Sequence, residues 1–381
     1  MKDFSFKVNY NECITNVACS ILKYFNCNYY HNTIPVLDDI FNKSNPKNVI
    51  LLLFDGLGSR ILDKTLDKDS FLIKNRIKEI TSVFPSTTAS STLSVQTGLN
   101  PVEHGWLGWT NYISPMNNSM VLFWDVEKGK TPKDGKNEEF VKIKQEYLSP
   151  KFLVDLIKEK DCETYSISPY SDYKYKTLNQ MFETIKEKLE IKTDKKKFMY
   201  VYNNEPDSTM HRHGCDSKEA IKSILERNKK VEEFYNNNIE KDTLMIIVAD
   251  HGHINGDSIY LKDYPDIKNL MEREIWVEER CPMFKIKEGK KNEFKELFEK
   301  NLGEYFYLLS KEEIKNRQIF GDIKYKENTL FDSSLGDFMA INKGNHNKAI
   351  VGDNDFQMVS VHGGNTDDEV YIPLIVLNKN N

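Results

Sequence analysis

Aspartate and histidine residues recur along the chain at or shortly after the ends of short apolar runs. In chain order they are Asp55, Asp207, His211, Asp250, His251 and His362. Carboxylate oxygens and imidazole nitrogens are common ligands of zinc in proteins. Carboxylates that are buried together repel one another unless cations neutralise their charge. If the fold gathers these side chains, the residue types therefore predict a metal site with enough ligands for two ions.

The spacing within this set differs from pair to pair. Asp207 and His211 are four residues apart, so both would lie on one face of a helix that begins there. Asp250 and His251 are adjacent, and both can reach one ion only from irregular backbone, such as the turn after a strand. Each residue alone has a plainer interpretation, as a helix cap, a turn residue or part of a surface pair. Only the whole set indicates metal binding, because packing alone does not explain it.

A run of hydroxyl side chains occupies residues 84–91, which read FPSTTASS. One of these Ser or Thr residues would cap the helix that is expected to follow. A hydroxyl group at a helix N-terminus also lies in a positive potential, close to free backbone N–H groups. That environment suits phosphate binding and a nucleophilic oxygen, so a capping role does not exclude a catalytic one.

The elements that must position these residues are short strands that alternate with helices. Apolar runs predict strands at residues 49–54, 80–84, 198–202, 244–249, 357–361 and 371–377. Helical spacing is found between them, for example at 150–159 and 218–236. This alternation predicts an α/β fold, with a doubly wound, mostly parallel central sheet and helices on both faces. In such sheets ligands bind beyond the carboxyl ends of the strands, where the aspartates stand.

The alternation is interrupted in the second half of the chain, between residues 254 and 345. This stretch contains strand-like residues 282–286 and 305–309 and a charged helical segment at 292–301. We expect residues 254–345 to form a small α+β cap inserted into the main domain. The expected catalytic domain then consists of residues 1–253 and 346–381.

The composition argues against several classes of partner. Lys+Arg 53 against Asp+Glu 58 gives a formal charge of −5, so no strongly basic field favours a nucleic-acid polymer or an anionic membrane. The six cysteines lack CxxC spacing, and we expect reduced thiols rather than a disulfide framework. Polar residues interrupt the apolar stretches near the N-terminus, and no run approaches the length of a membrane span. We therefore expect a cytoplasmic protein.

Five segments carry more specific information. They read, in order, VILLLFDGLG, VFPSTTASSTLSVQTGLNPVEHG, EPDSTMHRHG, VADHGH and VHGG. In order and spacing these segments resemble motifs of the alkaline phosphatase superfamily, in its nucleotide pyrophosphatase/type I phosphodiesterase branch. The resemblance implies an alkaline phosphatase-like fold and two zinc ions, with manganese as the other metal to consider. It assigns Asp207, His211 and His362 to one ion, and Asp55, Asp250 and His251 to the other, with Thr88 alongside.

The same resemblance indicates the nucleophile. In the family it stands four residues after the Phe of the FP turn, which selects Thr88 over Thr87. The implied reaction is hydrolysis of a phosphodiester or pyrophosphate bond through a covalent phospho-threonine. Two positions depart from the family pattern: Ser91 stands where an Asn helps to hold the phosphoryl oxygen, and Ala89 where an aromatic residue helps to stack a nucleobase. Ser91 is our candidate for a substrate contact, and a nucleotide is only one candidate substrate.

Several other functions fit the same motifs. A phosphonate hydrolase or a phosphomonoesterase of the superfamily would differ only in its substrate pocket, and a catalytically silent protein could hold a phosphorylated ligand on the same metals. A sulfatase and a phosphoglycerate mutase are disfavoured, because their signature patterns are missing. We expect diesters or pyrophosphates to be preferred over monoesters, since we find no motif for an extra magnesium site or a phosphate-gripping arginine. The expected partner is a small phosphorylated substrate, and the sequence leaves the oligomeric state open.

The remaining histidines and tryptophans carry weaker signals. His253, in the VADHGH segment, is the best candidate among the other histidines for a substrate contact. His104, in the sequence NPVEHG, is more typical of a residue that braces a turn. Trp106, Trp109 and Trp124 could line the substrate pocket, although large aromatic side chains more often belong to the core.

Overall fold

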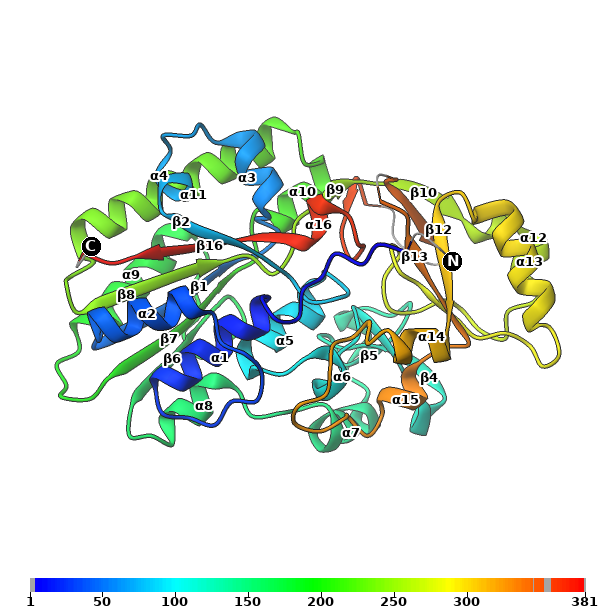
Figure 1. The fold of residues 1–381 in the computed structure, drawn as a ribbon, viewed down its shortest axis with the longest axis horizontal. Coiled ribbons are helices and arrows are strands. Elements are labelled where there is room, and N and C mark those ends of the chain that lie inside the picture. Colours follow the sequence, from blue (N-terminus) through cyan, green and yellow to red (C-terminus); the bar gives the residue numbers. More distant parts are fainter. Residues whose placement is uncertain (1–3, 345, 353–357, 380–381) are drawn as a thin grey trace.

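A computed structural model describes residues 4–344, 346–352 and 358–379 of the chain. The larger part of the molecule, at the left of Figure 1, is built around a six-stranded central sheet with the strand order β2–β16–β8–β1–β7–β6. The bounds of the strands are β1 (Asn48–Phe54), β2 (Arg76–Thr81), β6 (Glu163–Ile167), β7 (Lys197–Asn203), β8 (Thr243–Val248) and β16 (Tyr371–Leu377).

The direction of the strands decides which residues meet at each edge of this sheet. Strand β1 pairs in parallel with β7 and β8, and β6 pairs in parallel with β7. Strand β16 is antiparallel to both of its neighbours, β8 and β2. Every residue of β1 and β8 is buried, as expected for strands covered on both faces. The carboxyl ends of the parallel strands therefore share one edge with the loop that precedes β16.

Helices cover both faces of the sheet, as Figure 1 shows. One face carries α1 (Ile14–Tyr24), α2 (Pro35–Ser44), α5 (Thr88–Thr97) and α8 (Leu153–Lys158). The other carries α3 (Ser59–Thr65), α4 (Phe71–Lys74), α9 (Leu178–Glu190), α10 (Asp207–His213) and α11 (Lys218–Asn238). In α11 the buried residues Ala220, Ile224 and Val231 recur at helical spacing. The predicted doubly wound, mostly parallel sheet with helices on both faces is confirmed.

The strand predicted at residues 80–84 ends earlier than expected. Strand β2 stops at Thr81, and the next backbone N–H, that of Ser82, donates to Val370 O at 2.8 Å. Phe84 is fully buried, but in a second hydrophobic cluster outside the sheet. The apolar run therefore continues past the strand because it enters another core, not because the strand is longer.

The strand predicted at residues 357–361 does not join the central sheet. Gln357 lies outside the described residues, and the two-residue strand β15 (Ser360–Val361) pairs antiparallel with β9 (Ile254–Asn255). The described part of this predicted strand therefore pairs outside the central sheet. An apolar run indicates burial, but it does not reveal which strand will be the partner.

A smaller lobe lies at the right of Figure 1. It contains β10 (Asp257–Tyr260) paired with β14 (Lys348–Val351), and a sheet of β11 (Met283–Phe284), β13 (Phe338–Asn342) and β12 (Phe306–Ser310). Its helices include α12 (Pro265–Lys268), α13 (Lys291–Leu302), α14 (Lys311–Asn316) and α15 (Phe331–Ser334). Phenylalanines 284, 294, 298 and 306 form much of its core. The predicted strands at 282–286 and 305–309 and the predicted helix at 292–301 correspond to β11, β12 and α13.

A segment from the first half of the chain packs against this lobe. It forms α6 (Pro101–His104), α7 (Glu138–Tyr147) and a sheet of β3 (Thr110–Ile113), β4 (Asn118–Val121) and β5 (Val126–Glu127). Thr110 forms an antiparallel bridge with Val277, and Ser114 Oγ donates to Ser333 Oγ at 2.8 Å. The predicted domain organisation stays a proposal: a catalytic domain of residues 1–253 and 346–381, with a cap inserted at residues 254–345.

Two further expectations concern the chain as a whole. All six cysteines, which lie within the described residues, are free thiols. Among the described residues, no helix combines the length and the apolar character that crossing a membrane requires. Short 3-10 helices η1 (Ser114–Met116), η2 (Pro132–Asp134) and η3 (Leu261–Asp263), and the helix α16 (Asp367–Val370), complete the secondary structure.

Candidate metal centre

The predicted aspartates and histidines meet at the carboxyl edge of the central sheet. Asp55 follows β1, Asp250 and His251 follow β8, and α10 begins at Asp207, four residues after β7 ends. His362 arrives from the loop before β16, which reaches this edge because β16 runs antiparallel to β8. Two groups of side chains result, each with ligand atoms that all lie within 4.8 Å of one another.

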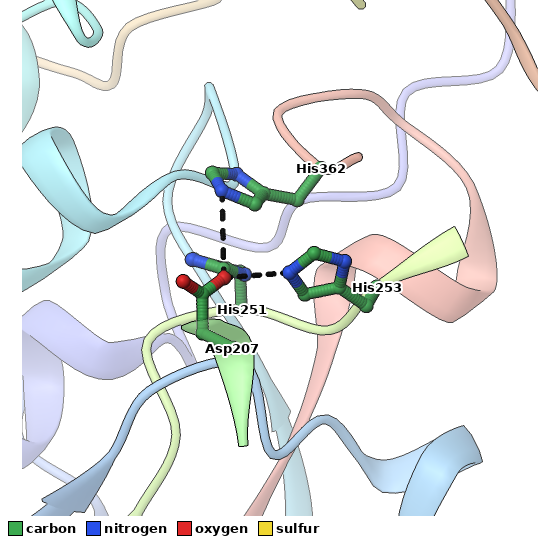
Figure 2. Close-up of side chains that lie close together, drawn as sticks. All are labelled: Asp207, His251, His253 and His362. Carbon is green, nitrogen blue, oxygen red and sulfur yellow. Dashed lines mark hydrogen bonds and ion pairs between the residues drawn. The ribbon is translucent and has the colours of Figure 1, made fainter. Parts of the chain in front are cut away.

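The first group consists of Asp207, His251, His253 and His362, and the predicted ligand His211 is not a member of it. Three histidines nevertheless surround one oxygen of Asp207. His253 Nε2 lies 2.6 Å from Asp207 Oδ1, His211 Nε2 lies 3.2 Å from it, and His362 Nε2 lies 3.7 Å from it. Figure 2 shows Asp207 between His253 and His362, with His251 beside it. The predicted helical spacing of Asp207 and His211 is realised, because both lie on α10. His211 is fixed from behind, since its Nδ1 lies 2.7 Å from Ser360 O of β15.

The second group joins Asp55, Asp250 and His251. His251 Nε2 lies 3.3 Å from Asp55 Oδ1 and 3.7 Å from Asp250 Oδ2. The backbone N–H groups of Gly56 and His251 both donate to Asp250 Oδ1 at 3.0 Å. The hydroxyl of Tyr202 donates to Asp55 Oδ2. These bonds hold one oxygen of each carboxylate and leave the other oxygen facing His251.

Several buried polar atoms of the centre have no protein partner. Within the described part of the chain, Asp250 Oδ2, His253 Nδ1 and His362 Nδ1 accept or donate no hydrogen bond. An unpaired carboxylate oxygen in a buried site is costly unless a cation or a proton satisfies it. Carboxylate and imidazole donors at this spacing suit zinc, and they suit manganese less well. The residues present therefore fit the metal that the motifs imply.

The protonation of these groups reflects their crowding. Burial, and then the charge of Asp55, raise the pKa of Asp250 well above its ordinary value. Burial would lower the pKa of His251, but the charges of Asp250 and Asp55 raise it to about 10. Burial and the neighbouring histidines lower the pKa of His362 well below its ordinary value. Without a cation, the pKa values of Asp250 and His251 therefore both lie above their ordinary values. Such shifts are expected where a cation normally balances the charge of clustered carboxylates.

The structure separates the two adjacent threonines of the hydroxyl-rich turn. Thr88 Oγ1 lies 3.2 Å from His251 Nε2 and 3.4 Å from Asp55 Oδ1. Thr87 Oγ1 points elsewhere and donates to Glu278 Oε1 at 2.6 Å. Thr88 is the first residue of α5, so its hydroxyl lies at the positive end of that helix.

Ser91 lies deeper than a substrate contact would suggest. Its side chain is fully buried, and its Oγ lies 2.7 Å from Ser82 Oγ, which donates to Asp250 O at 2.5 Å. In this structure Ser91 supports the turn that carries Asp250, and its role in substrate binding stays a prediction.

Among the residues of the site, His253 carries only a weak signal in the sequence and Glu278 carries none. His253, which we expected only as a substrate contact, lies against Asp207. Glu278, from the 254–345 region, had no signal, because nothing in the local pattern shows that this glutamate reaches the turn at Thr87. Burial raises the pKa of Glu278 to about 7, although bonds from Thr87 Oγ1 and Trp109 N favour its charged form.

The other aromatic and histidine residues divide between core and surface. Trp106 is buried, and its indole N–H donates to Leu148 O at 2.9 Å. His104 lies 3.0 Å from Ser94 Oγ and accepts from Trp106 N, so it braces a turn as expected. Trp124 is partly exposed, and its ring lies 5.2 Å from that of Trp109.

Comparison with known proteins identifies the fold and the family. The α/β fold is of the alkaline phosphatase-like class. Residues 49–363 match the family model described as type I phosphodiesterase/nucleotide pyrophosphatase. Because this match spans most of the chain, the protein belongs to that family.

Individual relatives agree with this assignment. The chain is 28% identical over 206 residues to human ectonucleotide pyrophosphatase/phosphodiesterase family member 1, a match that covers 51% of this chain but only 22% of that protein. The murine ectonucleotide pyrophosphatase/phosphodiesterase 5 structure superposes with a TM-score of 0.61 at 20% identity, covering 86% of this chain and 87% of that chain. The human counterpart gives 0.63 at 18% identity, covering 87% and 88%. An inactive form of the murine protein is also known in complex with AMP.

Proposed function

We propose that this protein hydrolyses phosphodiester or pyrophosphate bonds, with Thr88 as the nucleophile and two zinc ions as cofactors. The position of the Thr88 hydroxyl carries the proposal, since Oγ1 lies 3.2 Å from His251 Nε2 and 3.4 Å from Asp55 Oδ1. Those two residues would share one ion with Asp250, and Asp207, His211 and His362 would hold the other. When bound, the ions supply Lewis-acid stabilisation of negative charge and lower the pKa of an adjacent hydroxyl.

The side chains of the centre divide the remaining work. Thr88 Oγ1 loses its proton and attacks phosphorus as the bond to the leaving oxygen breaks; the leaving oxygen takes up a proton, and a phospho-threonine forms. The N-terminus of the ten-residue helix α5 presents free backbone N–H groups and a positive potential to the phosphoryl oxygens. A water molecule then attacks phosphorus, breaks the bond to Thr88 and regenerates its hydroxyl. Tyr202, which donates to Asp55, and Ser360, which lies behind His211, keep the ligands oriented.

Exposed aromatic side chains provide surface for the second ester group. The side chain of Tyr170 is 74% exposed. The pKa of Tyr170 is raised by partial desolvation and then by the charge of Asp55, so this ring lies near the metal centre. Phe123 and Trp124 are partly exposed and lie beside Trp109, whose backbone N–H reaches Glu278. An aromatic or apolar alcohol, such as a nucleoside, is a suitable occupant. The AMP complex of the murine relative supports a nucleotide among the candidate substrates.

A comparison of three synthetic substrates tests the proposed reaction. A nitrophenyl phosphodiester, its phosphomonoester and a nitrophenyl phosphonate are assayed at matched concentrations with zinc-loaded protein. We expect kcat/KM for the diester to exceed that for the monoester. A monoester brings an additional negative charge, and the motifs include no extra magnesium site or arginine that would neutralise it. A higher value for the monoester would assign the protein to the phosphomonoesterases, and a higher value for the phosphonate to the phosphonate hydrolases. No turnover of any of them would favour a phospho-ligand binder.

A further inference from the structure

Glu278 brings a carboxylate from the smaller lobe to the candidate metal centre. Its Oε1 accepts hydrogen bonds from Thr87 Oγ1 at 2.6 Å and from Trp109 N at 2.7 Å. Thr87 immediately precedes the proposed nucleophile. Glu278 also packs on Gly363, the residue after His362, where an added Cβ would lie 3.0 Å from the Cβ and Cγ of Glu278. The carboxylate therefore lies between the nucleophile turn and the loop that supplies His362.

The backbone before Glu278 is held in an unusual conformation. Val277 has φ of +82°, a region that β-branched residues rarely adopt. The N–H of Val277 donates to the backbone and side-chain oxygens of Thr110, both at 3.1 Å. Gly108 lies against Val277, where a Cβ would come within 2.8 Å of Val277 Cγ1. Strained backbone persists only where its surroundings impose it, and it is often found at functional sites. Here it fixes the direction of Glu278.

The charges of His251 and His211, both of the candidate metal centre, favour the ionised form of Glu278, and among the described residues no lysine or arginine forms an ion pair with it. Its two described hydrogen bonds come from a hydroxyl and a backbone amide, both of which favour the ionised carboxylate. The centre already contains the carboxylates of Asp55, Asp207 and Asp250. Those three lie in the metal-binding groups, whereas Glu278 lies outside both groups. Its negative charge thus opposes any further negative charge that a substrate brings to Thr88.

We infer that Glu278 determines the substrate class, because its charge disfavours dianionic phosphomonoesters and leaves monoanionic diesters as the substrates. The inference rests on the proposed function and adds the residue responsible for the preference. A monoester carries about two negative charges above its second pKa of about 6, whereas a diester carries one. Repulsion from a fixed charge therefore acts more strongly on the monoester. Such a repulsive element is a general means of achieving specificity.

Two substitutions separate the charge of Glu278 from its hydrogen bonds. Glu278→Gln retains an oxygen that can accept from Thr87 and Trp109 but removes the charge, whereas Glu278→Ala removes both. Glu274→Gln, at an exposed position of the same segment, is the matched control. The assay pH is about 8.5, so that the carboxylate and the monoester are both ionised.

The expected result is a change in the ratio of two rates. In Glu278→Gln, kcat/KM for the monoester relative to the diester rises about tenfold or more, while Glu274→Gln matches the wild type. Glu278→Ala lowers kcat for both esters, because the turn at Thr87 loses its anchor. An unchanged ratio in Glu278→Gln, with diester turnover intact, would overturn the inference and leave the proposed function standing.

A binding measurement decides the inference without turnover. Inorganic phosphate and dimethyl phosphate are titrated calorimetrically into zinc-loaded Thr88→Ala protein, with and without Glu278→Gln. We expect the added substitution to tighten phosphate binding about tenfold relative to dimethyl phosphate. Equal effects on both anions would overturn the inference. If the wild-type protein hydrolyses neither ester, the proposed function fails, and this titration still shows whether Glu278 selects against the dianion.

Discussion

Thr88 and Thr87 are adjacent in the chain but have different surroundings. The hydroxyl of Thr88 lies within 3.4 Å of Asp55 and His251, whereas that of Thr87 is used by Glu278. A slip of one residue in the turn would exchange these roles. The helix start at Thr88 fixes the register, because the N-cap residue Thr87 has extended backbone and its side chain bonds to Glu278 instead of capping the helix.

This difference predicts distinct results for two alanine variants. Thr88→Ala should retain its fold and both metals but lose about a thousandfold or more in kcat, because it removes the proposed nucleophile. Thr87→Ala should lose about tenfold, since it only loosens the turn. Steady-state assays with the nitrophenyl diester, together with metal analysis of each variant, provide the check. Equal losses, or a larger loss in Thr87→Ala, would contradict the assignment of Thr88 as the nucleophile.

His253 illustrates how a single side chain can support a ligand without being an evident part of the motif. It lies 2.6 Å from Asp207 Oδ1, closer than either His211 or His362. Hydrogen bonds from neighbours commonly orient the carboxylates that bind metals. We interpret His253 as a residue that orients Asp207, and its position two residues after His251 is the only sign of this in the sequence.

The loop between β15 and β16 is an element whose position depends on a buried ion pair. Arg280, from the smaller lobe, donates through Nε and Nη2 to the two oxygens of Glu369 at 2.9 and 2.8 Å. Glu369 Oε1 also accepts from Gly364 N at 2.9 Å, two residues after His362. Neither side chain of the pair is exposed. The pair therefore ties the loop that carries His362 to the smaller lobe.

Breaking this pair should destabilise the protein in a pH-dependent way. Burial would raise the pKa of Glu369, but Arg280 and the hydrogen bonds hold it below its ordinary value. A lowered folded-state pKa stabilises the protein above the unfolded value of about 4.3, and the stabilisation is lost as the pH falls. Glu369→Gln should lower the free energy of unfolding at pH of about 7 by about 3–5 kcal/mol, because Arg280 stays buried and unpaired.

Denaturant unfolding at neutral and acidic pH measures this effect. The difference between Glu369→Gln and the wild type should shrink as the pH falls below about 4, where the wild type also loses the charge. Asp367→Asn is a suitable control, since Asp367 is half exposed and pairs with Lys7 on the surface, and it should change stability by less than about 1 kcal/mol. A constant difference across this pH range would contradict the assignment.

Metal binding should contribute to the stability of the entire chain. Three buried carboxylates meet at one edge of the sheet, and cations that bind only the folded state stabilise it by mass action. We expect two zinc equivalents per chain by elemental analysis, and a fall in Tm of about 5 °C or more on chelation. A double variant, Asp55→Asn with Asp207→Asn, should show no shift on chelation. Fewer than two equivalents after reconstitution would contradict a two-metal centre.

The sequence alone determined the residue types and most of their local positions. The strand-end aspartates were predictable because apolar runs mark buried strands, and parallel strands present their carboxyl ends together. The start of α10 at Asp207 followed from the spacing of Asp207 and His211. These features depend on periodicity over a few residues, and the sequence shows that directly. The five motifs added the family, which the match over residues 49–363 supports.

Only the tertiary structure decided how distant segments meet. The antiparallel direction of β16 brings His362 to the metal centre. The apolar run that predicts this strand does not reveal whether the strand runs parallel or antiparallel to its neighbours. Likewise, the two residues of β15 do not indicate that this strand pairs with β9 and not with the central sheet. Glu278 reaches Thr87 across 191 positions of the chain because Val277 is held by Thr110. Such contacts depend on long-range packing, and no local pattern of residues encodes which partner a buried side chain will find.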